Sequence, residues 1–197
     1  MPTLEVWFEF ASTYSYPALM RVEARARQAG VALAYRPFLL GPIFASQGWK
    51  DSPFNIYEAK GKYMWRDLAR ICAAEGLPLR RPSVFPRNGL LAARVAYSGG
   101  QQAWVPAFVR GVYDANFAED REISSPEVLA SILSAVGQDP AARLALAASD
   151  EVKAGLREQN ESAQRRGIFG APSFCAGDEL FWGNDRLEQA LAWATQR

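Results

Sequence analysis

The chain begins with a short apolar segment, residues 4–10, in which Glu5 and Glu9 are the charged positions. Its aromatic and branched side chains predict a central β-strand. An amphipathic helix is predicted over residues 16–28, where apolar and arginine positions fall on opposite faces. Residues 31–35 form a second short apolar segment. Strand, helix and strand in close succession indicate a βαβ unit, so the two strands are expected to be parallel.

Turn-forming residues interrupt this pattern between residues 37 and 55, where Gly41, Pro42 and Pro53 occur. We expect an irregular loop there, and a loop of that length in a compact domain is often functional. From residue 57 to 167 the apolar spacing is mainly helical. The expected helices include residues 65–72, 88–98, 103–118 and 149–166, and two more begin at Ser125-Pro126 and Asp139-Pro140.

The C-terminal part returns to short apolar segments. Residues 173–176 and 179–182 are predicted strands, and Gly177-Asp178 between them is a tight hairpin turn. A final helix is predicted over residues 186–195, capped by Gly183-Asn184-Asp185. The whole chain therefore has the order βαβ, a helical block, and ββα.

This order is that of the thioredoxin fold, an α/β fold that accepts a large all-α insertion between its two halves. We expect a thioredoxin-like domain made of residues 1–40 and 165–197 and a helical insertion domain over residues 41–164. The helical block should face the junction after the first strand and share one cleft with it. The topology by itself says little about function.

Composition removes several function classes. The 197 residues include no histidine, 22 Lys and Arg, and 21 Asp and Glu, for a net charge of +1. Without histidine there is no Ser-His-Asp triad, no Cys-His pair and no imidazole metal site. The two cysteines, Cys72 and Cys175, form no CxxC motif, which excludes a cysteine-rich zinc site and disfavours a disulfide oxidoreductase. The balanced charge gives no reason to expect nucleic acid or an anionic membrane as partner.

The sequence also bears on the compartment. The first ten residues carry two glutamates and lack the basic start and long apolar core of a signal peptide. No apolar run approaches the ~20 residues that cross a bilayer. Two cysteines without a pairing pattern fit a reducing environment. We therefore expect a soluble cytoplasmic protein.

Four local features bear on function more directly. Ser12 lies at the first strand–helix junction, where the thioredoxin fold places its reactive cysteine. Ala171-Pro172 precedes the third strand, where the fold carries a cis-proline. Residues 182–185 open the last helix, and residues 54–64 open the helical block.

Together these features resemble the 2-hydroxychromene-2-carboxylate isomerases, a branch of the thioredoxin superfamily shared with kappa-class glutathione transferases and helical-insert disulfide oxidoreductases. The resemblance runs over nearly the whole chain. Its most specific pieces are FASTYSY at 10–16, KGKYMWRDL at 60–68, GIFGAP at 167–172 and WGNDRL at 182–187. It implies a glutathione-dependent isomerase of aromatic catabolism that opens a cyclic hemiketal and yields a trans-benzylidenepyruvate.

The chain departs from the family pattern in two places. Thr13 follows Ser12, where a proline is common. In the loop before the helical block many members carry Gly-Asn, whereas here Gly48 is followed by Trp49. Asn55 is the nearest asparagine and is expected to replace the family's. Gly48, Trp49 and Asn55 are thus the substrate contacts that we predict in this loop.

Ser12 has two compatible interpretations. A serine before a helix is most often an N-cap. The helix N-terminus also carries a partial positive charge that stabilises a thiolate, and a serine hydroxyl can donate a hydrogen bond to the sulfur. Because this site has no cysteine, the sulfur must arrive on a ligand, and the resemblance names glutathione as that cofactor. Ser12 is the predicted catalytic residue.

The resemblance implies further contacts to glutathione. With a cis bond before Pro172, the backbone of Ala171 would pair with the cysteinyl part of glutathione as a short added strand. The alternative is an ordinary turn with a trans proline. The segment Trp182-Gly183-Asn184-Asp185 would hold the γ-glutamyl end, or would only cap the last helix. Lys60 would lie near the glycyl carboxylate, unless Lys60 and Lys62 are both solvated charges.

Other residues have weaker assignments. Asn88 and Arg87 either begin a helix or face the substrate. Cys175 and Cys72 are expected to be buried structural thiols. The aromatic residues between 44 and 65 belong either to the core or to the wall of a pocket for a flat aromatic substrate.

Two other functions stay open from the sequence. One is a kappa-like glutathione transferase or peroxidase on the same site, and the other is a non-catalytic glutathione- or peptide-binding module. The expected partners are glutathione and a small aromatic substrate. The family often forms dimers, so a second copy of the chain is a candidate partner as well.

Overall fold

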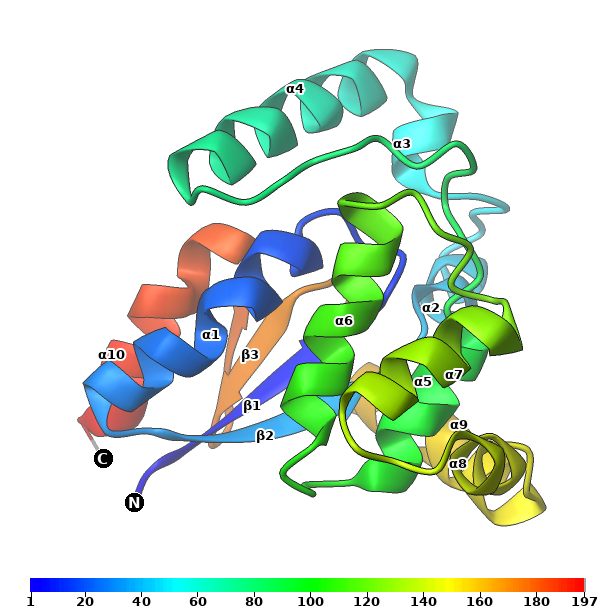
Figure 1. Ribbon diagram of the computed structural model, residues 1–197. Helices are drawn as coiled ribbons and strands as arrows, with labels where there is room; N and C mark the ends of the chain where they lie inside the picture. Colours follow the sequence, from blue (N-terminus) through cyan, green and yellow to red (C-terminus); the bar gives the residue numbers. More distant parts are fainter. Residues whose placement is uncertain (197) are drawn as a thin grey trace.

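The computed structural model describes residues 1–196 and contains one mixed sheet of four strands (Figure 1). The strands are β1 (Thr3–Phe8), β2 (Ala32–Pro37), β3 (Ser173–Ala176) and β4 (Glu179–Trp182), in the order β2-β1-β3-β4. β1 and β2 are parallel, and β3 is antiparallel to both β1 and β4. The predicted βαβ unit, the hairpin and the thioredoxin order of elements are therefore confirmed.

The two faces of the sheet are covered by different helices. On one face, Val6, Phe8 and Phe174 pack into a core shared with α1 (Ser15–Ala29) and α10 (Leu187–Thr195). On the other face, Trp7 and Cys175 pack against α2 (Leu40–Ser46) and α9 (Asp150–Arg165). Successive side chains of a strand point to opposite faces, which accounts for this alternation.

Eight helices described in the structure lie between β2 and β3. They are α2 (Leu40–Ser46), α3 (Pro53–Ile56), α4 (Glu58–Ala74), α5 (Leu90–Gly99), α6 (Val105–Phe117), α7 (Pro126–Ala135), α8 (Pro140–Ala147) and α9 (Asp150–Arg165). The predicted starts hold, because the side chains of Ser125, Asp139 and Ser149 accept backbone N–H bonds at the caps of α7, α8 and α9. None of the described helices is long and apolar enough to cross a bilayer.

The segment between residues 37 and 55 corrects the expectation of an irregular loop, because α2 and α3 lie within it or begin in it. Pro42 and Pro53 stand in the first turns of these helices. A proline is tolerated there because the N–H groups of the first turn have no intrahelical partner. The prolines that indicated a loop in the sequence thus mark the starts of two helices.

The insertion and the sheet share one hydrophobic core. Phe10, just after β1, contacts Phe108 and Tyr113 of α6, with ring centroids 6.5 and 5.4 Å apart. α4 lies across from the N-terminal end of α1 (Figure 1), where the Tyr14 hydroxyl donates to Asp67 at 3.0 Å. The division into two domains at residues 40 and 165 stays a prediction.

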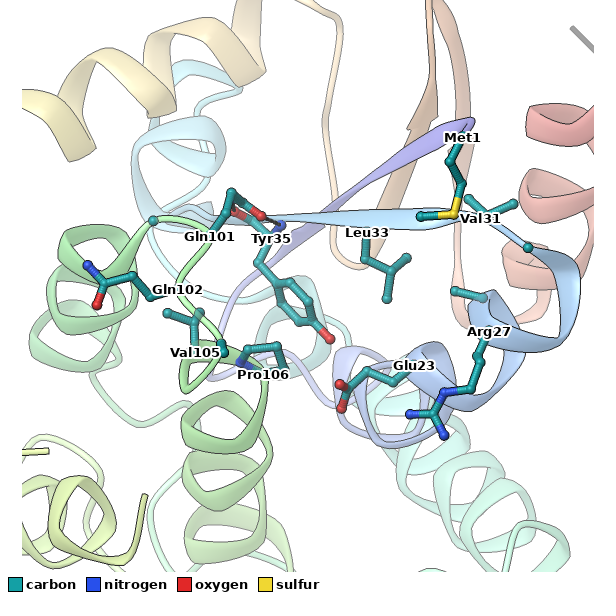
Figure 2. A pocket seen from close by; sticks show the side chains of 14 residues that line it. Met1, Glu23, Arg27, Val31, Leu33, Tyr35, Gln101, Gln102, Val105 and Pro106 are labelled. Carbon is teal, nitrogen blue, oxygen red and sulfur yellow. Dashed lines mark hydrogen bonds between the residues drawn. The ribbon is translucent and has the colours of Figure 1, made fainter. Parts of the chain in front are cut away.

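The outer edge of β2 is covered by a side chain. The Gln101 amide accepts a hydrogen bond from Tyr35 N–H at 3.1 Å and donates to Tyr35 C=O at 3.2 Å. A cavity of about 400 Å³ lies beside Gln101, between α1, β2 and the loop that precedes α6. Figure 2 shows the side chains that line it. A paired edge is protected from pairing with another chain.

Candidate active site

A larger cleft of about 1640 Å³ lies where the β1–α1 junction meets the helical block. Its wall is formed by residues from distant parts of the chain, among them Glu9, Ser12, Trp49, Lys60, Asn88, Ala171 and Asp185. The expectation that the helical block shares a cleft with the junction after the first strand is confirmed.

Ser12 is held at the base of α1 by two hydrogen bonds of its hydroxyl. The hydroxyl donates to Ala171 C=O at 2.9 Å and accepts from Ser15 N–H at 3.3 Å. The helix begins at Ser15, so Ser12 supports its first turn from three positions upstream. Ser12 therefore lines the cleft and supports the start of α1 at the same time. The helix-cap interpretation and the ligand-binding interpretation are compatible in this arrangement.

The segment at residues 170–172 adjoins Ser12 from the other side. The Ala171–Pro172 peptide bond is cis, as the resemblance implies. Ala171 lines the cleft, whereas Pro172 is buried behind it. The Pro172 carbonyl accepts a hydrogen bond from Gly183 N–H at 3.0 Å, which ties this segment to the start of the last helical region.

The four residues at 182–185 line the cleft with unequal exposure. Trp182 is 52% exposed, and its ring packs on Phe169 at a centroid distance of 4.8 Å. The Asn184 side chain is buried and accepts from Arg21 at 3.1 Å. Asp185 is exposed in a short 3-10 turn, Asn184–Arg186, that precedes α10. Asp185 is therefore the charged side chain that this segment offers to the cleft.

The two lysines near the start of α4 differ in their surroundings. Lys60 lines the cleft, with its Nζ 5.8 Å from the centre of the Phe54 ring. Lys62 does not line it and forms an ion pair with Glu58 at 2.6 Å. The structure thus places a cation at the cleft at position 60, whereas Lys62 is a solvated surface charge.

The predicted substrate-binding residues of this loop do not all line the cleft. Trp49 lines the cleft, but Gly48 and Asn55 do not. The Asn55 amide donates to Asp51 at 3.1 Å and to Phe85 C=O at 3.3 Å, so its donors are used within the loop. This placement argues against Asn55 as a substitute for the family asparagine.

Asn88 and Arg87 also line the cleft, yet both have structural partners. Asn88 Oδ1 accepts at 2.9 Å from the N–H of Leu90, the first residue of α5. The Arg87 guanidinium is buried and donates to Asp120 and to Asn116. The structure favours helix initiation for Asn88 and an anchoring role for Arg87.

The protein offers no thiol to the cleft, because neither of its two cysteines lines it. Cys72 is 1% exposed and Cys175 is 4% exposed. Burial raises the pKa of Cys72 to about 11, and burial likewise raises the pKa of Cys175. Both are inert core thiols in this environment.

Glu9 is a cleft residue that the sequence patterns did not single out. It follows β1 directly and precedes Ser12 by three positions. Burial of its carboxyl raises the pKa to about 7, opposed by the hydrogen bond that it accepts from Ala11 N–H at 3.2 Å. The available signal was a carboxylate at the end of an apolar strand, next to the catalytic candidate.

Aromatic rings dominate the remaining wall of the cleft. The rings are those of Tyr14, Phe44, Trp49, Phe54, Tyr63, Phe85, Phe169 and Trp182. Of the two interpretations of the aromatic residues between 44 and 65, the pocket wall applies to Phe44, Trp49, Phe54 and Tyr63. Such a wall fits a flat apolar ligand that carries a few polar groups.

Comparison with known proteins agrees with this arrangement. The model of the DSBA-like thioredoxin domain family matches residues 3–192. The 2-hydroxychromene-2-carboxylate isomerase of Sphingobium xenophagum is 30% identical over 186 residues, which cover 94% of either chain. The glutathione S-transferase kappa 1 of Homo sapiens is 24% identical, covering 94% of this chain and 88% of the relative.

A solved structure points the same way. A 2-hydroxychromene-2-carboxylate isomerase matches with a TM-score of 0.89 at 26% identity, covering 98% of this chain and 95% of that one. The chain therefore belongs to the DSBA-like thioredoxin domain family and, within it, to the family of 2-hydroxychromene-2-carboxylate isomerases.

Proposed function

We propose that the protein is a glutathione-dependent isomerase that opens a 2-hydroxychromene-2-carboxylate-type ring to a trans-benzylidenepyruvate. One observation carries the proposal most directly. Ser12 stands at the N-terminus of α1 in a cleft to which the protein brings no thiol, although this fold places its reactive cysteine there. A site of that kind binds and activates a thiol that arrives on a ligand.

The groups around Ser12 suit the charges of glutathione. The N-terminal end of α1 favours a thiolate, and no acidic residue stands in the first turn of that helix. Lys60 would hold the glycyl carboxylate and Asp185 would hold the ammonium group. The Gly183 N–H is already bonded to Pro172 C=O, so it is not free to bind the γ-glutamyl carboxylate.

Bound glutathione would supply a thiolate that adds reversibly to a conjugated double bond and so permits rotation about it. The Ser12 hydroxyl must then turn from Ala171 C=O, its acceptor at 2.9 Å, toward the sulfur. That exchange replaces a neutral hydrogen bond by a charge-assisted one, which is roughly twice as strong. The aromatic walls would hold the flat ring of the substrate and keep water from it.

The test is turnover of 2-hydroxychromene-2-carboxylate by the purified protein with and without glutathione, followed by the absorbance of the ring-opened product. We expect turnover that requires glutathione and does not consume it. A rate that is the same without glutathione would refute the cofactor assignment. No turnover under either condition would refute the isomerase assignment.

A kappa-like glutathione transferase or peroxidase is a second candidate, and it is favoured by the similarity to the human kappa 1 protein. It would use the same thiolate at Ser12 but would consume glutathione. Assays with a haloarene and with a hydroperoxide, beside the chromene substrate, separate the two activities. Glutathione binding without any turnover would point instead to a binding module.

A further inference from the structure

We propose that Glu9 is the acid–base group of the ring-opening step, an inference that rests on the proposed isomerase function. The chain has no histidine to move protons. Glu9 lines the cleft from the end of β1, on the same loop as Ser12. A substrate that contacts both residues would meet the thiol site and a carboxyl group together.

The backbone around Glu9 is fixed in a way that directs its side chain. Its carbonyl accepts hydrogen bonds from Ser12 N–H and from the Tyr113 hydroxyl, both at 3.0 Å. Its carboxylate oxygen Oε1 accepts from Ala11 N–H at 3.2 Å. Gly89 lies opposite, where an added Cβ would stand 3.2 Å from the same oxygen. The absence of a side chain at position 89 leaves room around the carboxyl.

Three other charged residues of the cleft, Asp51, Asp67 and Arg87, are already engaged by neighbouring side chains or backbone groups. Asp67 accepts the hydroxyl of Tyr14, whose pKa is raised by burial and by that carboxylate. Asp51 accepts from Asn55 and from Ser52 N–H, and Arg87 is paired with Asp120. Within residues 1–196, by contrast, no lysine or arginine forms an ion pair with Glu9. Its carboxyl is therefore free to exchange a proton with a ligand.

Neither Tyr113, which contacts Glu9, nor Tyr14 and Arg87, which line the same cleft, supplies a compensating charge. Tyr113 of α6 is neutral, because burial and the nearby carboxylate raise its pKa well above the usual value. Tyr14 at the start of α1 is neutral for the same kind of reason. Arg87, ahead of α5, has its charge balanced by Asp120 and by Glu122 at 3.5 Å. Burial can thus bring the pKa of Glu9 to about 7, near the value at which a group both takes and gives a proton efficiently.

The proposed step conserves atoms and electrons. The Glu9 carboxylate takes the proton of the hemiketal hydroxyl, and the electron pair of that O–H bond forms the new C=O bond. The ring C–O bond breaks, and its electron pair leaves on the phenol oxygen. Protonated Glu9 then delivers the same proton to that oxygen, so the carboxylate is regenerated and no co-reactant is needed.

The test compares Glu9→Gln with Glu9→Asp and with the control Glu5→Gln, whose carboxylate pairs with Arg36 and Arg166 outside the cleft. General acid–base catalysis contributes ~10²–10⁴-fold, so E9Q should lose at least about a hundredfold in kcat with glutathione affinity unchanged. E9D should recover part of the loss. The acidic limb of the wild-type pH–rate profile, near pH 7, should disappear in E9Q and persist in E5Q.

A second readout does not depend on turnover. Infrared difference spectra of the protein without ligands should show a carboxyl band that titrates near pH 7 in the wild type and is missing in E9Q. An E9Q variant with wild-type kcat and an unchanged pH profile would overturn the role of Glu9 while leaving the isomerase intact. A wild type that titrates as expected but does not turn over the chromene would overturn the isomerase proposal, and the role of Glu9 with it.

Discussion

Replacing Glu9 by glutamine should stabilise the protein at alkaline pH. The carboxyl is desolvated in the fold, and its pKa is raised from 4.5 to about 7. At ~1.4 kcal/mol per pKa unit, that rise corresponds to about 3 kcal/mol. The figure is a large fraction of the ~5–15 kcal/mol by which a domain is stable.

The direction of this pH dependence of stability follows from proton binding. Between pH 4.5 and pH 7 the folded protein keeps the Glu9 proton and the unfolded chain has lost it, so the free energy of unfolding falls as pH rises. The contribution of Glu9 is fully present below pH 4.5 and is lost once the pH passes 7. Glutamine carries no charge at any pH and still accepts the hydrogen bond from Ala11 N–H. At pH 8 the variant should be more stable than the wild type by about 2–3 kcal/mol.

Urea unfolding at several pH values from 5 to 8.5 measures this difference, because the midpoint and slope give the free energy of unfolding. The stability gap between E9Q and wild type should widen between pH 5 and pH 7 and level off above the pKa of Glu9. Glu5→Gln, on the same strand, removes ion pairs to Arg36 and Arg166 and should instead lower stability slightly at neutral pH. Parallel pH profiles for E9Q and wild type would show that the carboxyl is not desolvated and would refute the reasoning.

Three further predictions concern the rest of the cleft and the core. Ser12→Ala should still fold and bind glutathione, but the pKa of the bound thiol should rise by about one unit, since an exchanged hydrogen bond contributes ~1 kcal/mol. The thiolate absorbance of bound glutathione against pH measures this rise. If the titrations of variant and wild type coincide, Ser12 only supports the helix. Lys60→Ala should weaken glutathione binding about tenfold by calorimetry and Lys62→Ala should not, because Lys60 lines the cleft and Lys62 does not. Equal losses would contradict the assignment. Cys72 and Cys175 should react slowly with iodoacetamide at pH 8 in the native protein, because their pKa values are raised. Rapid labelling of either thiol, measured by mass spectrometry, would count against their burial.

The sequence by itself determined the features that depend on a few neighbouring residues. Ser125, Asp139 and Ser149 cap their helices through bonds to N–H groups two or three positions on, so local spacing was enough. Gly177 adopts a positive φ of 63° in the hairpin, which a glycine does without strain. The parallel pairing of β1 and β2 followed from the length of the helical connection.

The tertiary structure decided which of the suggested residues meet. The Asn55 amide donates to Asp51, four positions earlier, and also to Phe85 C=O, 30 positions away, and this second contact depends on tertiary packing. Lys60 and Lys62 look alike along the chain, and only the packing of α4 across the cleft separates them. Glu9 is the clearest case of a property that the sequence alone could not reveal. In the sequence it is an ordinary carboxylate, and its raised pKa arises from desolvation by segments far away in the chain, which only the folded arrangement brings around it.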